Sequence, residues 1–289
     1  RCKMVKNNLV IAHGDLDGII STVCLMEFYE LKIAETEVFF VQPFTVDKAE
    51  IPEETEEVFV VDVAVNNRDP QMTIDFIRRI GDRLVKWVDH HQGWTTEITG
   101  NNPAFVIIPE AKSCASIIGI DPILMSDAEK ADTRTGTLSS RAILIEQAMK
   151  ANLSDDSIRL VAVKWLLGDK TAGLDLEEAA KKYAEIQAET ERLTATYLIL
   201  FDKQVAIVDA RKSNRYYDLT QLLLAGQKLV PFAIVLTVHP QQGEGLTIAT
   251  SRKDVNLVEL FGLGSGAPFR VSLPGKRLDE AIEKLAKIQ

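Results

Sequence analysis

The first part of the chain alternates short apolar runs with stretches of helical periodicity. The apolar runs occur at 9–12, 38–41, 58–61, 84–88 and 105–108. Runs this short and this apolar are typical of strands buried on both faces. Strands that alternate with helices favour a parallel sheet with helices on both sides. The sequence therefore predicts an α/β fold built on a central parallel sheet.

Helix signals fill the spaces between these runs and continue beyond them. Asp69-Pro70 is typical of a helix start, because Asp suits the N-cap and Pro the first turn. Gly81 is expected to end that helix. Further helices are predicted by periodicity at 137–150, 156–167 and 176–200. We expect the last of these, which is long and charged, to link two domains.

The pattern changes after residue 202, where short strands and helices mix. Strands are predicted at 205–208, 232–238, 246–249 and 269–273, and helices at 218–224, 255–260 and 278–288. We therefore predict a first domain at 1–177, a helical linker at 178–202 and a smaller mixed α/β domain at 203–289.

Charge is spread unevenly between these regions. The chain has a net charge of −9, of which residues 1–202 contribute −13 and residues 203–289 contribute +4. An acidic body suits bound cations and a basic tail suits an anion, although uneven solvated surface is the simpler alternative. Three scattered cysteines without a CxxC pair favour a reducing, cytoplasmic location. No signal peptide is recognised and no apolar stretch approaches the roughly 20 residues that span a bilayer, so no membrane association is expected.

Acidic residues and histidines gather where three of the predicted strands end. They are His13, Asp15 and Asp17, then Asp62, then Asp89, His90 and His91. The carboxyl ends of parallel strands share one edge of a sheet, where α/β proteins bind ligands. If the three strands are neighbours, these groups converge.

Several carboxylates brought together would repel one another, and a divalent cation removes that penalty. Oxygen ligands with some imidazole and no thiolate favour Mn²⁺ or Mg²⁺ over structural zinc, and so many ligands favour two ions. Single residues have simpler explanations: Asp17 as a helix cap, Asp62 as a turn acid, either histidine as a hydrogen-bonded structural residue. The coincidence at three strand ends favours the metal site.

Asp169 follows the predicted helix at 156–167. A carboxylate is disfavoured at a helix C-terminus, so a nearby cation would explain this residue. An exposed loop acid beside Lys170 is the alternative.

These segments resemble the motifs of the DHH phosphoesterase superfamily, which includes RecJ nucleases, nanoRNases, cyclic-dinucleotide phosphodiesterases and exopolyphosphatases. The first three motifs correspond to the segment from His13 to Gly18, to Val61-Asp62 and to Asp89-His90-His91. Gly168-Asp169 is the match to the fourth. The resemblance covers about residues 8–175.

The resemblance implies two Mn²⁺ ions bridged by Asp62. It implies that one ion is also held by His13 and Asp15. The other ion would be held by Asp17, His90 and Asp169. Asp89 would orient its neighbours, and His91 would face the substrate phosphate.

Residues 203–289 resemble the substrate domain that accompanies DHH cores. That domain usually carries a Gly-Gly-Gly-His loop, whereas this chain has Gly-Ser-Gly-Ala at 264–267 and lacks the loop histidine. The expected phosphate-binding residues are Arg252, Ser265, Gly266 and Arg270. A structural turn is the simpler explanation of the glycines.

We therefore expect a Mn²⁺-dependent phosphodiesterase that hydrolyses short oligonucleotides or linear or cyclic dinucleotides with water activated by two metals. Few clustered aromatics and an acidic body favour a short substrate over a long polymer. The alternatives are a polyphosphate or pyrophosphate hydrolase and a non-catalytic nucleotide sensor. A homodimer stays an open alternative.

Overall fold

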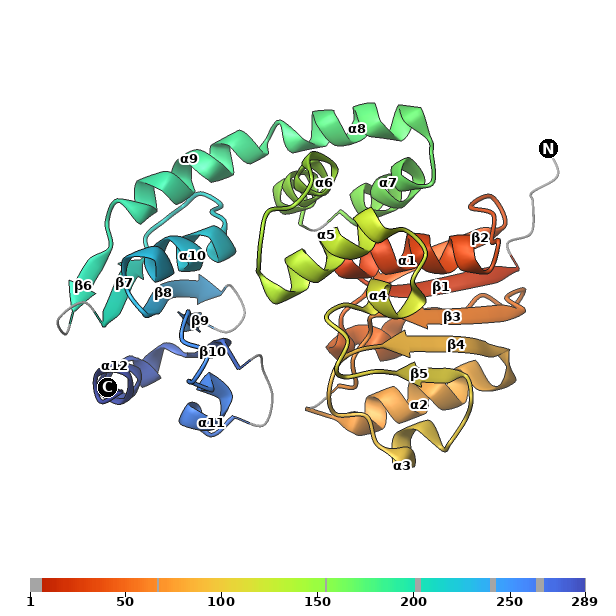
Figure 1. Ribbon diagram of the computed structural model, residues 1–289, viewed down its shortest axis with the longest axis horizontal. Helices are drawn as coiled ribbons and strands as arrows, with labels where there is room; N and C mark the ends of the chain where they lie inside the picture. Colours follow the sequence, from red (N-terminus) through yellow and green to blue (C-terminus); the bar gives the residue numbers. More distant parts are fainter. Residues whose placement is uncertain are drawn as a thin grey trace. The chain divides into compact units, whose positions relative to one another are not determined.

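The computed structural model describes residues 7–66, 68–153, 155–200, 204–239, 243–263 and 268–288. The chain divides into two compact units, with the boundary between Lys181 and Lys182. The first unit contains sheet A and the second contains sheet B (Figure 1).

Sheet A has five strands in the order β2-β1-β3-β4-β5, and every neighbouring pair is parallel. The strands are β1 (Asn8–His13), β2 (Thr36–Val41), β3 (Glu57–Val61), β4 (Leu84–Asp89) and β5 (Phe105–Ile107). Each predicted apolar run overlaps one of them, so the predicted α/β class and parallel sheet are confirmed.

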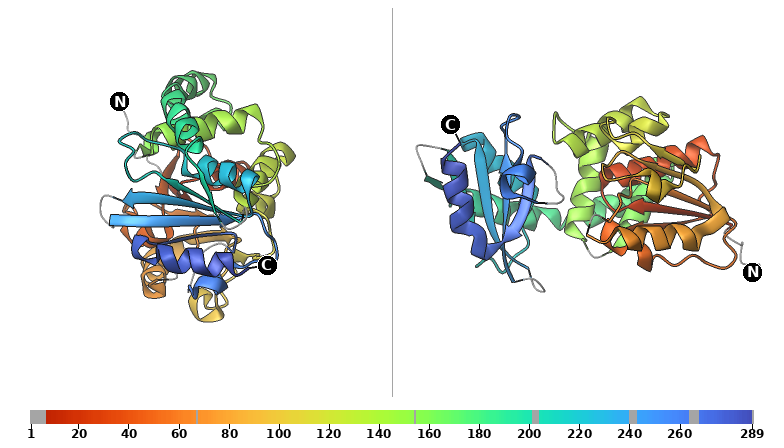
Figure 2. Two further views of the ribbon diagram at one scale, coloured as in Figure 1. Left: turned by 90° about the vertical axis from the view of Figure 1, so that its left-hand side faces the viewer. Right: turned by 90° about the horizontal axis from the view of Figure 1, so that it is seen from below.

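Helices cover both faces of sheet A (Figures 1 and 2). They are α1 (Leu16–Phe28), η1 (Pro43–Lys48), α2 (Pro70–Ile80), η2 (Gly81–Arg83), α3 (Thr96–Thr99), α4 (Cys114–Ile118), α5 (Pro122–Thr133), α6 (Ser140–Ala151), α7 (Asp156–Leu166) and α8 (Lys170–Ala180). Because side chains alternate along a strand, Val10 and Ala12 of β1 join the core that contains α1. Leu9 and Ile11 of the same strand join the opposite core, with α2.

In sheet A, β2 lies on one side of β1 and β3 lies on the other side. The strand order therefore reverses between β1 and β3. In open parallel sheets, ligands bind at the carboxyl edge beside such a reversal. The fold places a binding site between the ends of these two strands.

Sheet B has the order β10-β9-β8-β7-β6, with β7 and β8 parallel and the other pairs antiparallel. Its strands are β6 (Leu198–Leu200), β7 (Val205–Asp209), β8 (Phe232–His239), β9 (Gly243–Thr250) and β10 (Arg270–Pro274). The helices of this unit are α9 (Tyr183–Thr194), α10 (Leu219–Leu229), α11 (Leu257–Phe261), η3 (Gly275–Arg277) and α12 (Leu278–Ala286). One core packs α11 and α12 on sheet B, and another packs α9 and α10. A separate mixed α/β unit is thus confirmed.

The single helix predicted over 176–200 is wrong. The structure has α8, a turn at Lys181 and Lys182, α9, and then β6. Leu198–Leu200 pair with β7 and so extend sheet B instead of a helix. The conformation of such a short segment depends on strand partners that are distant in sequence, and a periodicity pattern carries no information about those partners.

None of the helices described here has the length and apolar character needed to span a membrane.

Candidate metal centre

The three strands that end in acid or histidine are neighbours in sheet A. Ala12 of β1 pairs with Val61 of β3, and Val61 pairs with Val88 of β4. The residues that follow these three therefore emerge side by side. This convergence is the condition on which the predicted site depended, and the structure meets it.

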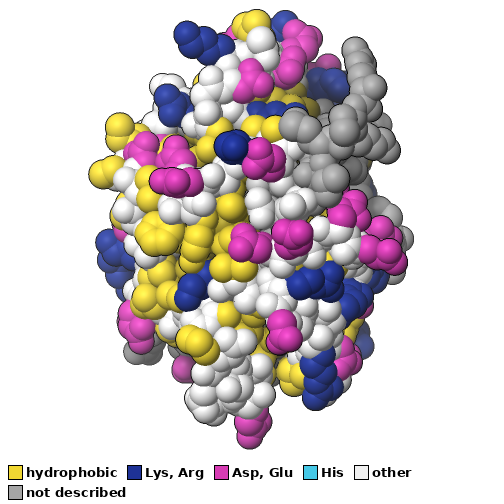
Figure 3. Space-filling view, turned by 90° about the vertical axis from the view of Figure 1, so that its right-hand side faces the viewer, with side chains coloured by type: hydrophobic (Ala, Val, Ile, Leu, Met, Phe, Trp, Pro, Cys, Tyr) yellow, Lys and Arg dark blue, Asp and Glu magenta, His cyan; other side chains and the backbone are white. Residues whose placement is uncertain are grey.

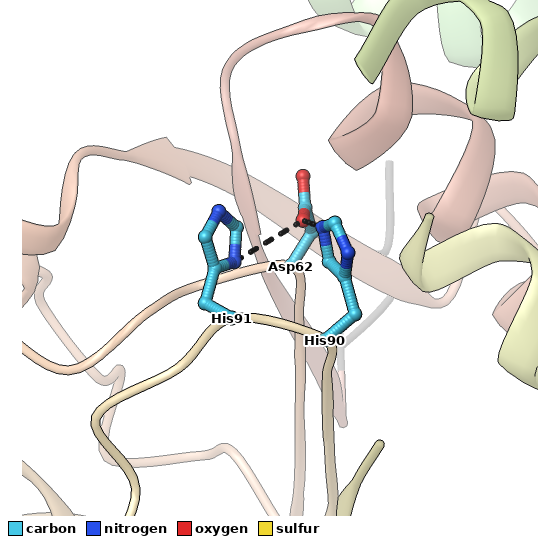
Figure 4. A group of neighbouring side chains, drawn as sticks. All are labelled: Asp62, His90 and His91. Atoms are coloured by element: carbon cyan, nitrogen blue, oxygen red, sulfur yellow. Dashed lines mark ion pairs between the residues drawn. The ribbon is translucent and has the colours of Figure 1, made fainter. Parts of the chain in front are cut away.

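Asp62 lies at the centre of the converging groups (Figure 4). Its side chain is 1% exposed, and its Oδ2 lies 3.7 Å from His13 Nδ1. Its Oδ1 lies 3.4 Å from His90 Nε2 and 3.8 Å from His91 Nδ1. The backbone has a φ of 58°, which is unusual for a residue other than glycine. Such strained conformations cluster at functional sites, where surrounding structure enforces them.

His13, Asp15 and Asp62 form the first group that could hold a cation. His13 Nδ1 lies 3.0 Å from Asp15 Oδ2. The other ring nitrogen, Nε2, lies 3.0 Å from Oε1 of Gln42, just after β2. If Nε2–H donates to this oxygen, the Nδ1 lone pair faces the carboxylates, as a metal-binding histidine requires. Gln42 was not predicted from the sequence.

Asp17, His90 and Asp132 form a second group. His90 Nε2 lies 3.6 Å from a carboxylate oxygen of each aspartate. His90 Nδ1 lies 3.2 Å from the carbonyl oxygen of Ala111, which assigns the proton to Nδ1 and leaves the Nε2 lone pair facing the acids.

Asp17 does not cap α1, so the simpler explanation of this residue is wrong. The cap is Asp15, whose Oδ1 accepts from Gly18 N. Asp17 is 1% exposed and accepts hydrogen bonds from the backbone N–H groups of Cys114 and Ala115 at the start of α4. These bonds fix the carboxylate in the cluster.

Asp132 was missed because α5 was missed. The helix begins at Asp121-Pro122, the same signal that begins α2 at Asp69-Pro70. Asp132 lies in the last turn of α5, where a carboxylate is disfavoured by the helix dipole. Asp132, not Asp169, is the carboxylate that lies both in the last turn of a helix and in the cluster.

Asp169 is not in any of the cation-binding groups found among the described residues. It is exposed and forms the N-cap of α8, where its Oδ1 accepts from Thr171 N at 2.9 Å. Hydrogen bonds from the Thr171 hydroxyl and backbone hold the pKa of Asp169 below its usual value. A new helix starts directly after α7, and the preference for Asp at an N-cap explains this residue without a cation.

Asp89 orients His91 from a buried position. Asp89 is 0% exposed, and its Oδ1 lies 2.8 Å from His91 Nδ1. Its Oδ2 accepts from Trp94 Nε1 at 2.7 Å. Burial raises the pKa of Asp89, but these two hydrogen bonds and the nearby imidazoles outweigh burial and lower it. Trp94 was not predicted as part of the site.

The charge at the cluster is poorly balanced by protein groups alone. Burial together with Asp62 and Asp15 raises the pKa of Asp17 well above its usual value. Burial and Asp62 also raise the pKa of Asp132, against the opposing effect of His90. Carboxylates that resist ionisation together are typical of sites that bind cations.

Four buried side-chain atoms of the cluster lack a hydrogen-bond partner among the described residues. They are Nδ1 of His13, Nε2 of His90, and Oδ1 and Oδ2 of Asp62. Buried polar atoms without partners are costly, yet here they face one another across the two groups. A divalent cation in each group would satisfy them, and the oxygen-rich donors suit Mn²⁺ or Mg²⁺. The residues therefore fit the metal centre that the resemblance implies.

The site belongs to one end of sheet A. Figure 3 views the molecule from the side where the strands of sheet A begin, and no histidine is visible on that surface. Acidic, basic and apolar side chains are interspersed there instead.

The predicted phosphate-binding residues belong to the second unit. Arg252 forms an ion pair with Asp254, with Nη2 2.5 Å from Oδ2. Arg270 on β10 donates from Nη1 to Thr220 Oγ1 at 3.3 Å. Ser265 and Gly266 lie outside the described residues.

In comparisons by sequence, no protein-family model and no curated protein matches the chain. Comparison by structure finds a pGpG-specific phosphodiesterase, PggH, from Vibrio cholerae, with a TM-score of 0.60 and 14% identity over 98% of this chain and 97% of that chain. RecJ from Thermus thermophilus in complex with Mn²⁺ has a TM-score of 0.61 and 13% identity. The match covers 96% of this chain and about half, 51%, of that RecJ chain.

A third similar structure is the DHH domain of a protein described as a member of a family of ribosomal proteins. It has a TM-score of 0.54 and 14% identity, and the match covers 98% of this chain and 86% of that one. Likeness at such low identity establishes the fold. The chain shares its fold with these three proteins, one of which is described as a DHH domain.

Proposed function

We propose that this protein is a metal-dependent phosphodiesterase that hydrolyses short oligonucleotides or linear or cyclic dinucleotides. The observation that carries the proposal is the shared carboxylate of Asp62. Its Oδ2 faces His13 and its Oδ1 faces His90, with distances of 3.7 and 3.4 Å. One carboxylate between two donor groups is the arrangement that a pair of metal ions requires.

Two ions, Mn²⁺ or alternatively Mg²⁺, would be held on either side of Asp62. His13 and Asp15 would hold one ion. Asp17, His90 and Asp132 would hold the other, so that Asp132 takes the place first expected for Asp169. When bound, the pair would lower the pKa of a shared water and neutralise charge on the phosphoryl oxygens.

His91 and Asp89 supply a hydrogen-bond donor to the substrate. Burial lowers the pKa of His91, but Asp89 and Asp62 outweigh it and raise the pKa to about 8. Because Asp89 accepts from His91 Nδ1, the opposite nitrogen, Nε2, is the one available to a phosphoryl oxygen. When protonated, His91 would donate from Nε2 and stabilise negative charge that grows there during hydrolysis.

The second unit would bind an anionic group through Arg252, Ser265, Gly266 and Arg270. Its net positive charge supports an anionic substrate. A short one is supported by the nearly end-to-end match to PggH, a protein described as specific for a linear dinucleotide. The same chemistry would serve a phosphoanhydride, so substrate profiling has to separate the two classes.

The test is a hydrolysis assay with Mn²⁺, Mg²⁺ or EDTA. The panel contains a linear dinucleotide, a cyclic dinucleotide, a tetranucleotide, pyrophosphate and a short polyphosphate. We expect Mn²⁺-dependent cleavage of a nucleotide substrate, abolished in Asp62→Asn and retained in Asp169→Asn. Hydrolysis of the phosphoanhydrides alone would assign the protein to the other class. Equal activity in Asp62→Asn would end the metal proposal.

A further inference from the structure

We propose that Arg159 is a positioning residue that holds the loop between β1 and α1 in the shape that ligates metal. The proposal rests on the proposed function, because it concerns the ion held by His13 and Asp15. Arg159 lies on α7, far along the chain from this loop.

The guanidinium of Arg159 contacts the backbone between the two ligands. Its Nε donates to the carbonyl oxygen of Gly14 at 2.7 Å, across 145 positions of sequence. Its Nη1 donates to Asp156 Oδ1 at 2.9 Å, and the side chain is only 11% exposed. The Gly14 carbonyl follows the last residue of β1. A buried carbonyl outside the sheet needs a donor, and Arg159 supplies one.

The absence of a side chain at Gly14 is explained by the same contact. A Cβ built there would lie 2.9 Å from Arg159 Nε and 3.5 Å from its Cδ. The φ of Gly14 is not among the positive values, so this glycine is not needed for a left-handed turn. A Cβ at Gly14 would instead require the Arg159 side chain to shift, which would alter its hydrogen bond to the Gly14 carbonyl.

The consequence is a restraint on both flanking ligands. His13 and Asp15 are joined to Gly14 by single peptide units, so a shift of its carbonyl moves their side chains. The groups around the His13 ring are Asp15 and Asp62 near Nδ1 and Gln42 on Nε2, and the donor to the Gly14 carbonyl is Arg159. Partners that orient metal ligands in this way typically affect metal affinity by roughly 10–100-fold.

The experiment measures Mn²⁺ binding to the full chain by calorimetry and by electron paramagnetic resonance of free Mn²⁺. The variants are Arg159→Gln, Arg159→Lys and Gly14→Ala. The matched control is Arg141→Gln on α6, because that guanidinium lies over the Trp165 ring, 5.6 Å from its centroid. Thermal unfolding in EDTA reports stability separately.

We expect Arg159→Gln to weaken one of the two Mn²⁺ binding steps by roughly 10–100-fold and to leave the other unchanged. Arg159→Lys keeps a cationic donor and should recover part of the loss. Gly14→Ala should weaken the same step, and the double variant should be no worse than the single ones, because both changes break one contact. Arg141→Gln should bind as the wild type does.

Unchanged Mn²⁺ affinities in Arg159→Gln, with only a lower unfolding temperature, would overturn the positioning role while leaving the proposed function intact. Additive losses in the double variant would also overturn it. If Arg159→Gln does not fold, Arg159→Lys and Gly14→Ala decide the question. A wild-type chain that binds no Mn²⁺ would overturn the proposed function and this inference together.

Discussion

Replacing Trp94 with phenylalanine tests whether the buried Asp89 carboxylate depends on its two donors. The change keeps an aromatic ring beside Trp87 and Phe105, whose centroids lie 5.2 and 5.6 Å from that of Trp94. It removes the indole N–H that donates to Asp89 Oδ2 at 2.7 Å. One oxygen of a carboxylate that is 0% exposed then loses its partner.

The expected loss of stability in Trp94→Phe follows from the charge and burial of the Asp89 carboxylate. Hydrogen bonds to charged groups contribute about 1.5–3 kcal/mol, and an unsatisfied buried charge lies at the upper end. For a unit of this size, 1 kcal/mol shifts the unfolding temperature by roughly 2–4 °C, so a fall of roughly 3–12 °C is expected.

The assay is thermal unfolding followed by tryptophan fluorescence, without added metal. All three tryptophans, at positions 87, 94 and 165, belong to the first unit, so fluorescence reports that unit alone. The control is the same change in an Asp89→Asn background, where the acceptor carries no charge. The cost of Trp94→Phe should be much smaller there. An equal cost in both backgrounds would refute the reasoning, because it would assign the loss to packing.

Three further predictions concern other parts of the chain. Gly18→Ala should destabilise the protein by about 1–3 kcal/mol in urea unfolding, since the new Cβ would lie 2.1 Å from the carbonyl oxygen of His13 at the end of β1. Helix propensity alone predicts the opposite, a gain in stability, and that result would contradict this account. Burial raises the pKa of the Cys24 thiol to about 12 and the pKa of the Cys114 thiol well above its usual value. In a Cys2→Ser variant, these two thiols should therefore resist iodoacetamide at pH 8 until the protein unfolds, and rapid labelling of the native protein would contradict this. Hydrogen bonds from Arg192 and Ser213 lower the pKa of Glu189 to about 2, so this carboxylate should stabilise the fold above pH 4.5, its unfolded pKa, and lose that effect as the pH falls toward 2. In thermal unfolding, the advantage of the wild type over Glu189→Gln should therefore shrink over that range, and a constant difference would exclude the ion pair as its source.

The sheet and most of the site could be predicted because local signals agree with the fold. Each strand of sheet A is a short apolar run, and its register brings His13, Asp62 and Asp89 together through neighbouring strands. The parallel arrangement predicts that these residues share one edge, and the adjacency of β1, β3 and β4, which the structure supplies, brings them together.

The sequence-based expectations differ from the structure where the partner that decides the conformation or the contact is distant in sequence. Asp169 follows α7 and is the N-cap of α8. A carboxylate is disfavoured at the C-terminus of a helix and favoured at an N-cap, so its interpretation depends on which helix it belongs to. Asp132 reaches the cluster only through the packing of α5 against α1 and α4. Gln42 and Trp94 carry no local signal for their roles, because each contributes one hydrogen bond to a residue on another segment.

The measurement that tests the central claim most directly is a Mn²⁺ titration of the wild type beside Asp132→Asn and Asp169→Asn. We predict two ions per chain in the wild type and in Asp169→Asn, and loss or strong weakening of one ion in Asp132→Asn, since Asp132 and not Asp169 is grouped with Asp17 and His90. Fewer than one ion bound to the wild type at saturation, or loss of an ion in Asp169→Asn and not in Asp132→Asn, would contradict the account.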